Sequence, residues 1–356
     1  MNSILVDDIK HVLAANLPWN LLHGKRIIIT GANGFLASFL VEALLYYNDQ
    51  LDCNASFEIV GVVRNIEKAT QKFKNHLDRK DFTLIQNDLT ADVESIFNKS
   101  GNIVIHAASQ ASPKYYGTDP VGTLTANIIG TYNLLRASQN NAVEYFMFFS
   151  SAEIYGQIFH KEKVSESDYG YLDPLDIRSC YSESKRMAET MCVSWLKQYS
   201  IPTKIVRLFH TYGPGMSLDD GRVFADFVAD VIAERDIHLK SDGSARRAFC
   251  YRADAIRGIF TVLFHGDSGE AYNVGNEACE TSILDLAKLV ADIFPELNLK
   301  VIQDVVTDLE MGYMKSSISR ICPDSTRLRL LGWQPAFTLQ EGFKKTILSY
   351  GKRVTS

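Results

Sequence analysis

A tyrosine and a lysine stand four residues apart in the stretch "CYSESKRMAE", which runs from Cys180 to Glu189. In a helix this spacing puts Tyr181 and Lys185 on one face, one turn apart. Such pairs also occur by chance on solvated helix surfaces. A free phenol has a pKa of about 10, and a neighbouring ammonium group favours its ionised form. The pair could therefore transfer a proton beside a redox cofactor, and the rest of the chain has to decide between these interpretations.

A glycine-rich turn, "TGANGFLA" (Thr30–Ala37), follows the apolar stretch "KRIIIT" and precedes a long apolar segment. Gly31 permits a tight turn, and Gly34 lets backbone N–H groups approach a pyrophosphate at a helix N-terminus. Ala37 is small enough for close packing of the helix on the strand. A plain strand–helix turn is the alternative, but this context favours a dinucleotide site. We expect its contacts from Gly31, Asn33, Gly34, Phe35 and Leu36.

A basic residue, Arg64, ends the second apolar segment in "GVVRN". Dinucleotide folds often carry a carboxylate in this region, where it binds the ribose hydroxyls. A guanidinium can instead bind a 2′-phosphate through paired hydrogen bonds. We therefore favour NADP(H) as cofactor, with NAD(H) as the other possibility. The bland alternative is a solvated arginine at a strand end.

Short apolar segments alternate with helical patterns through the first part of the chain. The expected strands are Lys25–Thr30, Phe57–Val63, Phe82–Gln86, Asn102–Ala108, Val143–Ser151 and Thr203–Phe209. A helix is expected over residues 65–77, between the second and third strands. This alternation predicts an α/β fold, a Rossmann-type doubly wound parallel sheet covered on both faces. After Tyr212 the alternation breaks down, which predicts a smaller C-terminal α/β lobe.

We therefore expect residues 1–211, including a short N-terminal helix, to form mainly the cofactor domain. Residues 212–356 should form mainly the substrate lobe, although late segments can return to the first domain.

Composition narrows the class of protein. The 356 residues are 46% hydrophobic, with a net charge of −5 and no basic block, so nucleic acid and membranes are not expected partners. No apolar run has membrane-spanning length, and the acidic N-terminal stretch is not a signal peptide. The six cysteines include no C-x-x-C pair, so we expect no metal site. A cytoplasmic protein with reduced thiols is the simplest interpretation.

Several motifs occur together and in a specific order: "TGANGFLA", "IHAAS", "ANIIGTYNLL", "SSAEIYG", "YSESK", "RLFHTYGPG", "RAFCY" and "YNVGN". Through them the chain, from Lys25 to about Gly351, resembles the extended short-chain dehydrogenase/reductase family, specifically its nucleotide-sugar epimerases and dehydratases. The resemblance implies a cofactor lobe and a C-terminal lobe that binds a nucleoside-diphosphate (NDP) sugar. It also implies a homodimer through a four-helix bundle, formed by helices around Thr123–Ser138 and Tyr181–Lys197.

The resemblance also assigns roles to individual residues. Tyr181 would be the acid/base, Lys185 its partner and ribose anchor, and Ser151 the third catalytic hydroxyl. Further cofactor contacts are implied at Asp88, Leu89, Ala107 and Ala108, and substrate contacts at Ser109, Ser151, His210, Arg222 and Arg247. Arg247 occupies the place of a diphosphate-binding arginine. His210 stands where the family commonly has asparagine, so it could bind substrate or be a satisfied core histidine.

The likeness is greatest to UDP-glucuronate decarboxylases and the related 4,6-dehydratases, with two departures. Ala152 replaces an aspartate that protonates the leaving group in dehydratases, and Gly215 replaces an arginine that assists decarboxylases. Glu153 is retained and could remove a proton beside a C4 ketone, or be an exposed loop glutamate. All these reactions begin with hydride transfer from the sugar's C4.

We expect a decarboxylase- or epimerase-like enzyme of surface polysaccharide precursor synthesis. NADPH-dependent reduction of a keto NDP-sugar is one alternative. A non-catalytic, cofactor-binding regulatory or scaffold protein is another, which the intact Ser151, Tyr181 and Lys185 disfavour.

Overall fold

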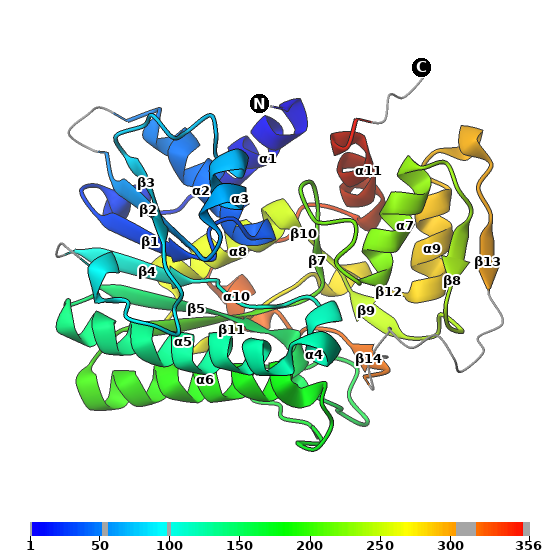
Figure 1. Cartoon of the computed structure of the whole chain (residues 1–356). Helices are drawn as coiled ribbons and strands as arrows, with labels where there is room; N and C mark the ends of the chain where they lie inside the picture. Colours follow the sequence, from blue (N-terminus) through cyan, green and yellow to red (C-terminus); the bar gives the residue numbers. More distant parts are fainter. Residues whose placement is uncertain (1, 52–55, 98–100, 304–317, 352–356) are drawn as a thin grey trace.

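A seven-stranded parallel sheet forms the centre of the molecule in the computed structural model, which describes residues 2–51, 56–97, 101–303 and 318–351 (Figure 1). Its strand order is β11-β6-β5-β4-β1-β2-β3. The strands are β1 (Arg26–Thr30), β2 (Glu58–Val63), β3 (Phe82–Gln86), β4 (Asn102–His106), β5 (Tyr145–Ser151), β6 (Thr203–Leu208) and β11 (Ala271–Val274). The predicted Rossmann-type sheet is confirmed.

Continuous burial explains why these segments are strands. Every residue of β1 and of β4 is buried, as expected where helices cover both faces of a parallel sheet. The six strands expected from the sequence are all present, with ends shifted by no more than two residues.

The helix expected over residues 65–77 is shorter than predicted. In the structure α3 spans Ile66–Lys72, and Asn65 caps it by accepting a hydrogen bond from the Lys68 N–H. Phe73 then leaves the helix and packs edge-on against Phe82 of β3, with 5.2 Å between ring centroids. α3 therefore ends where the Phe73 ring is buried, and it does not extend into the polar residues that follow.

Two layers of helices enclose the sheet. On one face the long helices α5 (Pro120–Asn140) and α6 (Ser179–Tyr199) run side by side (Figure 1). On the other face lie α2 (Phe35–Asn48) and α8 (Arg252–His265), with the N-terminal helix α1 (Ser3–Leu13) packed against both. Two large apolar clusters fill the spaces between the sheet and these helices.

In the described residues the second lobe contains three α-helices and short strands. Its helices are α7 (Val223–Ile232), α9 (Ile283–Ala291) and α11 (Leu339–Ser349). β9 (Arg246–Ala248) pairs with β12 (Glu280–Ser282) and β14 (Arg320–Ile321), while β8 (Ile237–Leu239) pairs with β13 (Val301–Gln303). β7 (Thr211–Tyr212) pairs with β10 (Cys250–Tyr251) and lies between the lobes in Figure 1. Between these segments, α8 and β11 return to the first sheet, and α10 (Thr326–Leu330) packs against both.

The strand order reverses between β1 and β4, and this reversal positions the candidate site. In open α/β sheets a crevice forms at such a point, beyond the carboxyl ends of the strands. The loops after β1, β4 and β5 all leave the sheet at that edge. Among the described helices, none combines the length and apolar character that a membrane crossing requires.

Candidate active site

The turn after β1 fits a dinucleotide pyrophosphate. Gly31 has a φ of +64°, and a Cβ atom there would lie 2.7 Å from the Cα of Ala108, so glycine is required. Gly34 is the N-cap of α2 and offers no side-chain cap, which leaves the amides of the first turn open to an anion. The buried Ser109 hydroxyl, just beyond β4, has no hydrogen-bond partner among the described residues. These features accommodate the predicted cofactor.

Three predicted catalytic side chains come together at this edge of the sheet. Ser151 ends β5, and its hydroxyl lies close enough to the phenol of Tyr181 on α6 to lower the pKa of that phenol against the effect of burial. Lys185 lies one turn further along α6, with its Nζ 5.9 Å from the centroid of the Tyr181 ring. A phenol with a hydroxyl and an amine close to it can in principle transfer a proton.

Burial controls the protonation of this set. It raises the pKa of Tyr181, while the Ser151 hydrogen bond and the Arg222 charge act in the opposite direction. Burial also lowers the pKa of Lys185 to about 7, although Glu189 partly offsets the effect. The Lys185 ammonium donates to the Phe149 carbonyl at 2.7 Å. In the protein alone the phenol is therefore held protonated, and further positive charge is needed to make it a base.

A second tyrosine covers the first. Tyr116, on the short helix α4 (Lys114–Thr118), stacks on Tyr181 with 5.0 Å between ring centroids and 16° between planes. Its hydroxyl donates to the Ala111 carbonyl at 3.0 Å. Tyr116 was not predicted from the sequence. The signal available was its place in "SPKYYG", between the "IHAAS" motif and the α5 helix.

Glu153 lies in a short 3₁₀ turn, η3 (Ala152–Tyr155), directly after Ser151. Its Oε1 is 3.5 Å from the Nη2 of Arg178, the residue that precedes α6. Both side chains also line a cavity of about 240 Å³ beside the site. Ala152 is buried, so its methyl group contributes packing at this position. Arg178 was not predicted, and the available signal was a cation three residues before Tyr181.

The predicted substrate-binding cations approach the site from the second lobe. Arg222, the N-cap of α7, donates to the Ala111 carbonyl at 3.3 Å and lies 3.6 Å from Asp220. Arg247 on β9 donates to the backbone carbonyls of Ser319 and Ile318. Burial holds the pKa of His210 well below its usual value, and the charges of Arg247, Arg222 and Arg178 add to the effect. The imidazole is therefore neutral, and its buried Nδ1 has no hydrogen-bond partner among the described residues.

Arg64 follows β2, as expected for a residue beside the adenosine ribose. Hydrogen bonds from the N–H and hydroxyl of Thr90 to its Oδ1 lower the pKa of Asp88, and the charge of Arg64 adds a smaller effect. Hydrogen bonds from Gln110 and Gly122 lower the pKa of Asp119, the N-cap of α5, again with a smaller effect of Arg64. Leu89 is buried, and its carbonyl accepts a hydrogen bond from Asn133. Both carboxylates are therefore within electrostatic reach of the Arg64 guanidinium.

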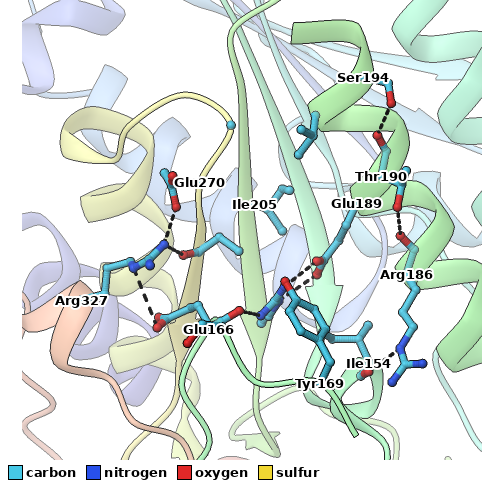
Figure 2. A pocket seen from close by; sticks show the side chains of 15 residues that line it. Ile154, Glu166, Tyr169, Arg186, Glu189, Thr190, Ser194, Ile205, Glu270 and Arg327 are labelled. Atoms are coloured by element: carbon cyan, nitrogen blue, oxygen red, sulfur yellow. Dashed lines mark hydrogen bonds and ion pairs between the residues drawn. The ribbon is translucent and has the colours of Figure 1, made fainter. Parts of the chain in front are cut away.

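A larger cavity, of about 590 Å³, lies away from the predicted residues, between α6, β6 and β11 (Figure 2). Its walls carry paired charges: Glu189 binds the buried Arg207, and Arg327 binds Glu270 and approaches Glu166. Glu189 also accepts a hydrogen bond from Ser150, the neighbour of Ser151. These hydrogen bonds join α6 to β5 and β6 close to Ser151. Within the described residues there is no cluster of three or more side chains suited to hold a metal ion.

Comparison with known proteins places this geometry in a family. The sequence profile of the NAD dependent epimerase/dehydratase family matches residues 27–275. UDP-glucuronic acid decarboxylase 6 of Arabidopsis thaliana is 32% identical over 320 residues, which cover 89% of this chain and 86% of the relative. UDP-glucuronic acid decarboxylase 1 of Xenopus tropicalis is 31% identical over 334 residues, or 93% of this chain and 73% of the relative.

Solved structures support the same fold. UDP-glucuronic acid 4-epimerase from Bacillus cereus, in complex with UDP-glucuronic acid and NAD, superimposes with a TM-score of 0.76 at 24% identity, covering 91% of this chain and 98% of that one. A dTDP-glucose 4,6-dehydratase from Bacillus anthracis, in complex with NAD, gives a TM-score of 0.73 at 17% identity, covering 92% and 96%. The resemblance that the sequence motifs indicated is confirmed, and the chain belongs to the NAD dependent epimerase/dehydratase family.

Proposed function

We propose that this protein is an NDP-sugar-modifying enzyme that oxidises the sugar at C4 and then transforms the resulting ketone by decarboxylation of UDP-glucuronate. The observation that supports this proposal is the convergence of Ser151, Tyr181 and Lys185 beside the glycine-rich turn at one edge of the sheet. A binding or scaffold protein would not need this set.

Each of the three residues has a defined task in the proposed reaction. Tyr181 takes the proton of the C4 hydroxyl, and Ser151 hydrogen-bonds the reacting oxygen. The charged form of Lys185 stabilises the phenolate. The bound dinucleotide supplies the acceptor for the C4 hydride and the additional positive charge. Because burial alone raises the pKa of Tyr181, this base should act only in the loaded enzyme.

The loop chemistry argues against dehydration. Elimination across C5 and C6 needs an acid for the leaving hydroxyl, and the methyl group of Ala152 cannot donate a proton. A 4-keto uronate does not need that acid: its C5–carboxylate bond breaks, CO₂ leaves, and the electron pair enters the C4 ketone as an enolate. Protonation at C5, return to C4 of the hydride that the dinucleotide would hold, and return of the proton from Tyr181 to the C4 oxygen would complete the reaction.

Decarboxylation here would proceed without an arginine at residue 215. Gly215 has a φ of +82°, which suits glycine. The nearby Arg252 is bound to the Pro214 carbonyl and to Asp8 of α1, 3.2 Å away. The relatives named as UDP-glucuronic acid decarboxylases favour an acidic sugar. Epimerisation at C4, and reduction of a keto NDP-sugar, remain the second candidates because Ser151, Tyr181 and Lys185 serve them equally.

We propose NADP(H) rather than NAD(H) as the cofactor, because Arg64 directly follows β2. Arg64 supports this prediction as a cation at the end of β2, and the presence of the Asp88 and Asp119 carboxylates within its electrostatic reach weakens it. The solved neighbours named with NAD favour NAD(H). Direct binding measurements on both dinucleotides decide between them.

We also propose a homodimer through α5 and α6. Their outer faces expose large apolar side chains, including Ile129, Tyr132, Met187 and Val193, and the indole N–H of Trp195 is buried without a partner in the described part of the chain. Such a stripe on two adjacent helices suits a four-helix bundle. A cytoplasmic role in making surface polysaccharide precursors is the expectation that accompanies this function.

The function is tested by product analysis. Purified protein is incubated with UDP-glucuronate, UDP-glucose or a 4-keto NDP-sugar, with NAD⁺, NADP⁺ or NADPH, in deuterated water. The products are identified by NMR. Formation of a UDP-pentose with deuterium at C5 supports decarboxylation, whereas abundant 6-deoxy-4-keto sugar contradicts our interpretation of Ala152. No conversion of any of these sugars contradicts the proposed function as a whole.

A further inference from the structure

Glu153 places a carboxylate where it opposes the proposed base. Burial is the main cause of the raised pKa of Tyr181, and the negative charge of Glu153 adds to it, while the Ser151 hydrogen bond and the charge of Arg222 act in the opposite direction. Burial also raises the pKa of Tyr116, whose ring is stacked on Tyr181, and the charges of Tyr181 and Glu153 add to this effect. A like charge beside an ionising phenol disfavours the phenolate. Glu153 therefore works against proton transfer by Tyr181 to the extent that nearby positive charges do not compensate for it.

Arg178 is in place to compensate for this charge. Its Nη2 lies 3.5 Å from the Oε1 of Glu153, and the exposed fractions of the two side chains are 13% and 23%. The guanidinium carbon lies 5.5 Å from the centroid of the Tyr116 ring. Ion pairs that are partly withdrawn from water are screened less than pairs on an open surface. On Tyr116, whose pKa burial raises, the charges of Arg222 and Arg178 act in the opposite direction. Arg178 also precedes Tyr181 by three residues at the start of α6, which is about one helical turn.

The backbone that carries Arg178 is fixed from both sides. The Arg178 N–H donates to the Asp176 Oδ1 at 2.9 Å, and the hydroxyl of Ser179 donates to the Asp173 carbonyl at 2.6 Å. These contacts set the start of α6, so Arg178 and Tyr181 keep a constant separation. Asp173 and Asp176 also line the small cavity next to the pair.

Other groups face Tyr181 from every element packed around it. These are Ser151 at the end of β5, Glu153 in η3, Tyr116 on α4, Arg222 before α7, and Lys185 and Cys180 on α6. Lys185 donates to the Phe149 carbonyl, and Arg222 lies next to Asp220. Among these cations and Arg178, Arg178 is the one whose guanidinium contacts Glu153.

We infer that Arg178 is a positioning residue that neutralises Glu153, so that this carboxylate can lie beside Tyr181 without suppressing ionisation of the catalytic phenol. The inference rests on the proposed function, because it takes Tyr181 as the base. It explains how one small site holds a carboxylate next to the sugar and a phenolate for the C4 hydroxyl. It also gives Arg178 a role that does not require contact with substrate.

The test is a titration of Tyr181 by NMR, in protein labelled with ¹³C at the tyrosine Cζ and loaded with whichever of NADP⁺ and NAD⁺ the wild type binds more tightly. Comparison with Tyr181→Phe assigns the signal among the sixteen tyrosines of the chain. Arg178→Gln should raise the pKa of Tyr181 by about half a unit to one unit, because it leaves Glu153 uncompensated. Arg178→Lys keeps the charge and should shift it by less than about 0.3 unit.

Two further variants separate charge from packing. The double variant Glu153→Gln/Arg178→Gln removes both charges and should return the pKa of Tyr181 to within about 0.3 unit of the wild-type value. Lys197→Gln removes a cation from the last turn of the same helix and should have no effect. If Arg178→Gln does not fold, Glu153→Gln tests the inference instead. It should lower the pKa of Tyr181, because the Arg178 charge is then no longer offset by the Glu153 carboxylate.

An unchanged pKa in Arg178→Gln, or a pKa that stays raised in the double variant, would overturn the inference. Failure of the proposed function would look different. The wild-type enzyme would then convert none of the NDP-sugars, while the titration of Tyr181 and its response to Arg178 would still be measurable.

Discussion

The ring of Tyr116 lies parallel to the ring of Tyr181, with a centroid separation of 5.0 Å and an angle of 16° between their planes. Offset stacking of this kind contributes about 0.5–1.5 kcal/mol beyond area burial. Here it also closes one face of the catalytic phenol to water, because Tyr116 is itself buried.

Tyr116→Leu should therefore keep the fold but slow turnover by about tenfold or more, because the Tyr181 ring loses the stacking that fixes its orientation. Tyr116→Phe preserves the stack and should retain turnover within about threefold. Steady-state rates with the same NDP-sugar check both variants. Equal, severe losses in Leu and Phe variants would show that the hydroxyl, and not the stacked ring, is needed.

The buried Lys185 should leave a signature in the pH dependence of stability. Its folded-state pKa is lowered to about 7 by burial, against about 10.4 in an unfolded chain. Between these pH values the unfolded chain holds more protons, so this group makes stability rise with pH over that window and leaves it constant below. Lys185→Met should flatten the rise.

Urea unfolding of the cofactor-free protein at pH 6.5, 8 and 9.5 measures this effect. Lys197→Met, on the same helix but exposed, is the matched control and should follow the wild type. Parallel curves for wild type and Lys185→Met would mean that Lys185 keeps its proton on folding.

The cofactor prediction depends on Arg64. Loss of a charge-assisted contact with a 2′-phosphate costs about 1.5–3 kcal/mol. Arg64→Ala should therefore weaken NADP(H) binding by roughly 10- to 150-fold and leave NAD(H) binding nearly unchanged. Isothermal titration with both dinucleotides gives the answer. Tighter or equal binding of NAD(H) by the wild type contradicts the preference for NADP(H), whatever the variant does.

The dimer prediction concerns the outer faces of α5 and α6. Ile129→Glu on α5 introduces a charge into the apolar stripe and should convert a dimer to a folded monomer. Leu330→Glu is the control, since Leu330 is 82% exposed on α10, away from that stripe. Sedimentation equilibrium distinguishes the states. A monomeric wild type, or a dimer that persists in Ile129→Glu, would contradict the predicted interface.

The sequence predicted the sheet well because its strands are buried on both faces, which leaves continuous apolar segments such as residues 27–29 and 103–105. The length of α3 was missed because a single buried ring, Phe73, ends a helix whose polar pattern continues. Local periodicity carries no information about such a tertiary contact.

Part of the candidate site was predictable because its residues lie close together in the sequence. Tyr181 and Lys185 share one helix, and the glycine turn is a local motif. By contrast, Tyr116 meets Tyr181 across 65 positions, and Glu153 meets Arg178 across 25. These pairs depend on where α4 and η3 come to lie against the start of α6, and no spacing rule links them. The large cavity behind α6 was not foreseen at all.

The most direct test of the account is the reaction of wild-type enzyme and Tyr181→Phe with UDP-glucuronate and dinucleotide, followed by NMR and by absorbance of the reduced nicotinamide. The account predicts conversion by the wild type, and a loss of about a thousandfold in rate in the variant with dinucleotide binding intact. Near-normal turnover by Tyr181→Phe would contradict the central claim that this phenol is the acid/base of the site.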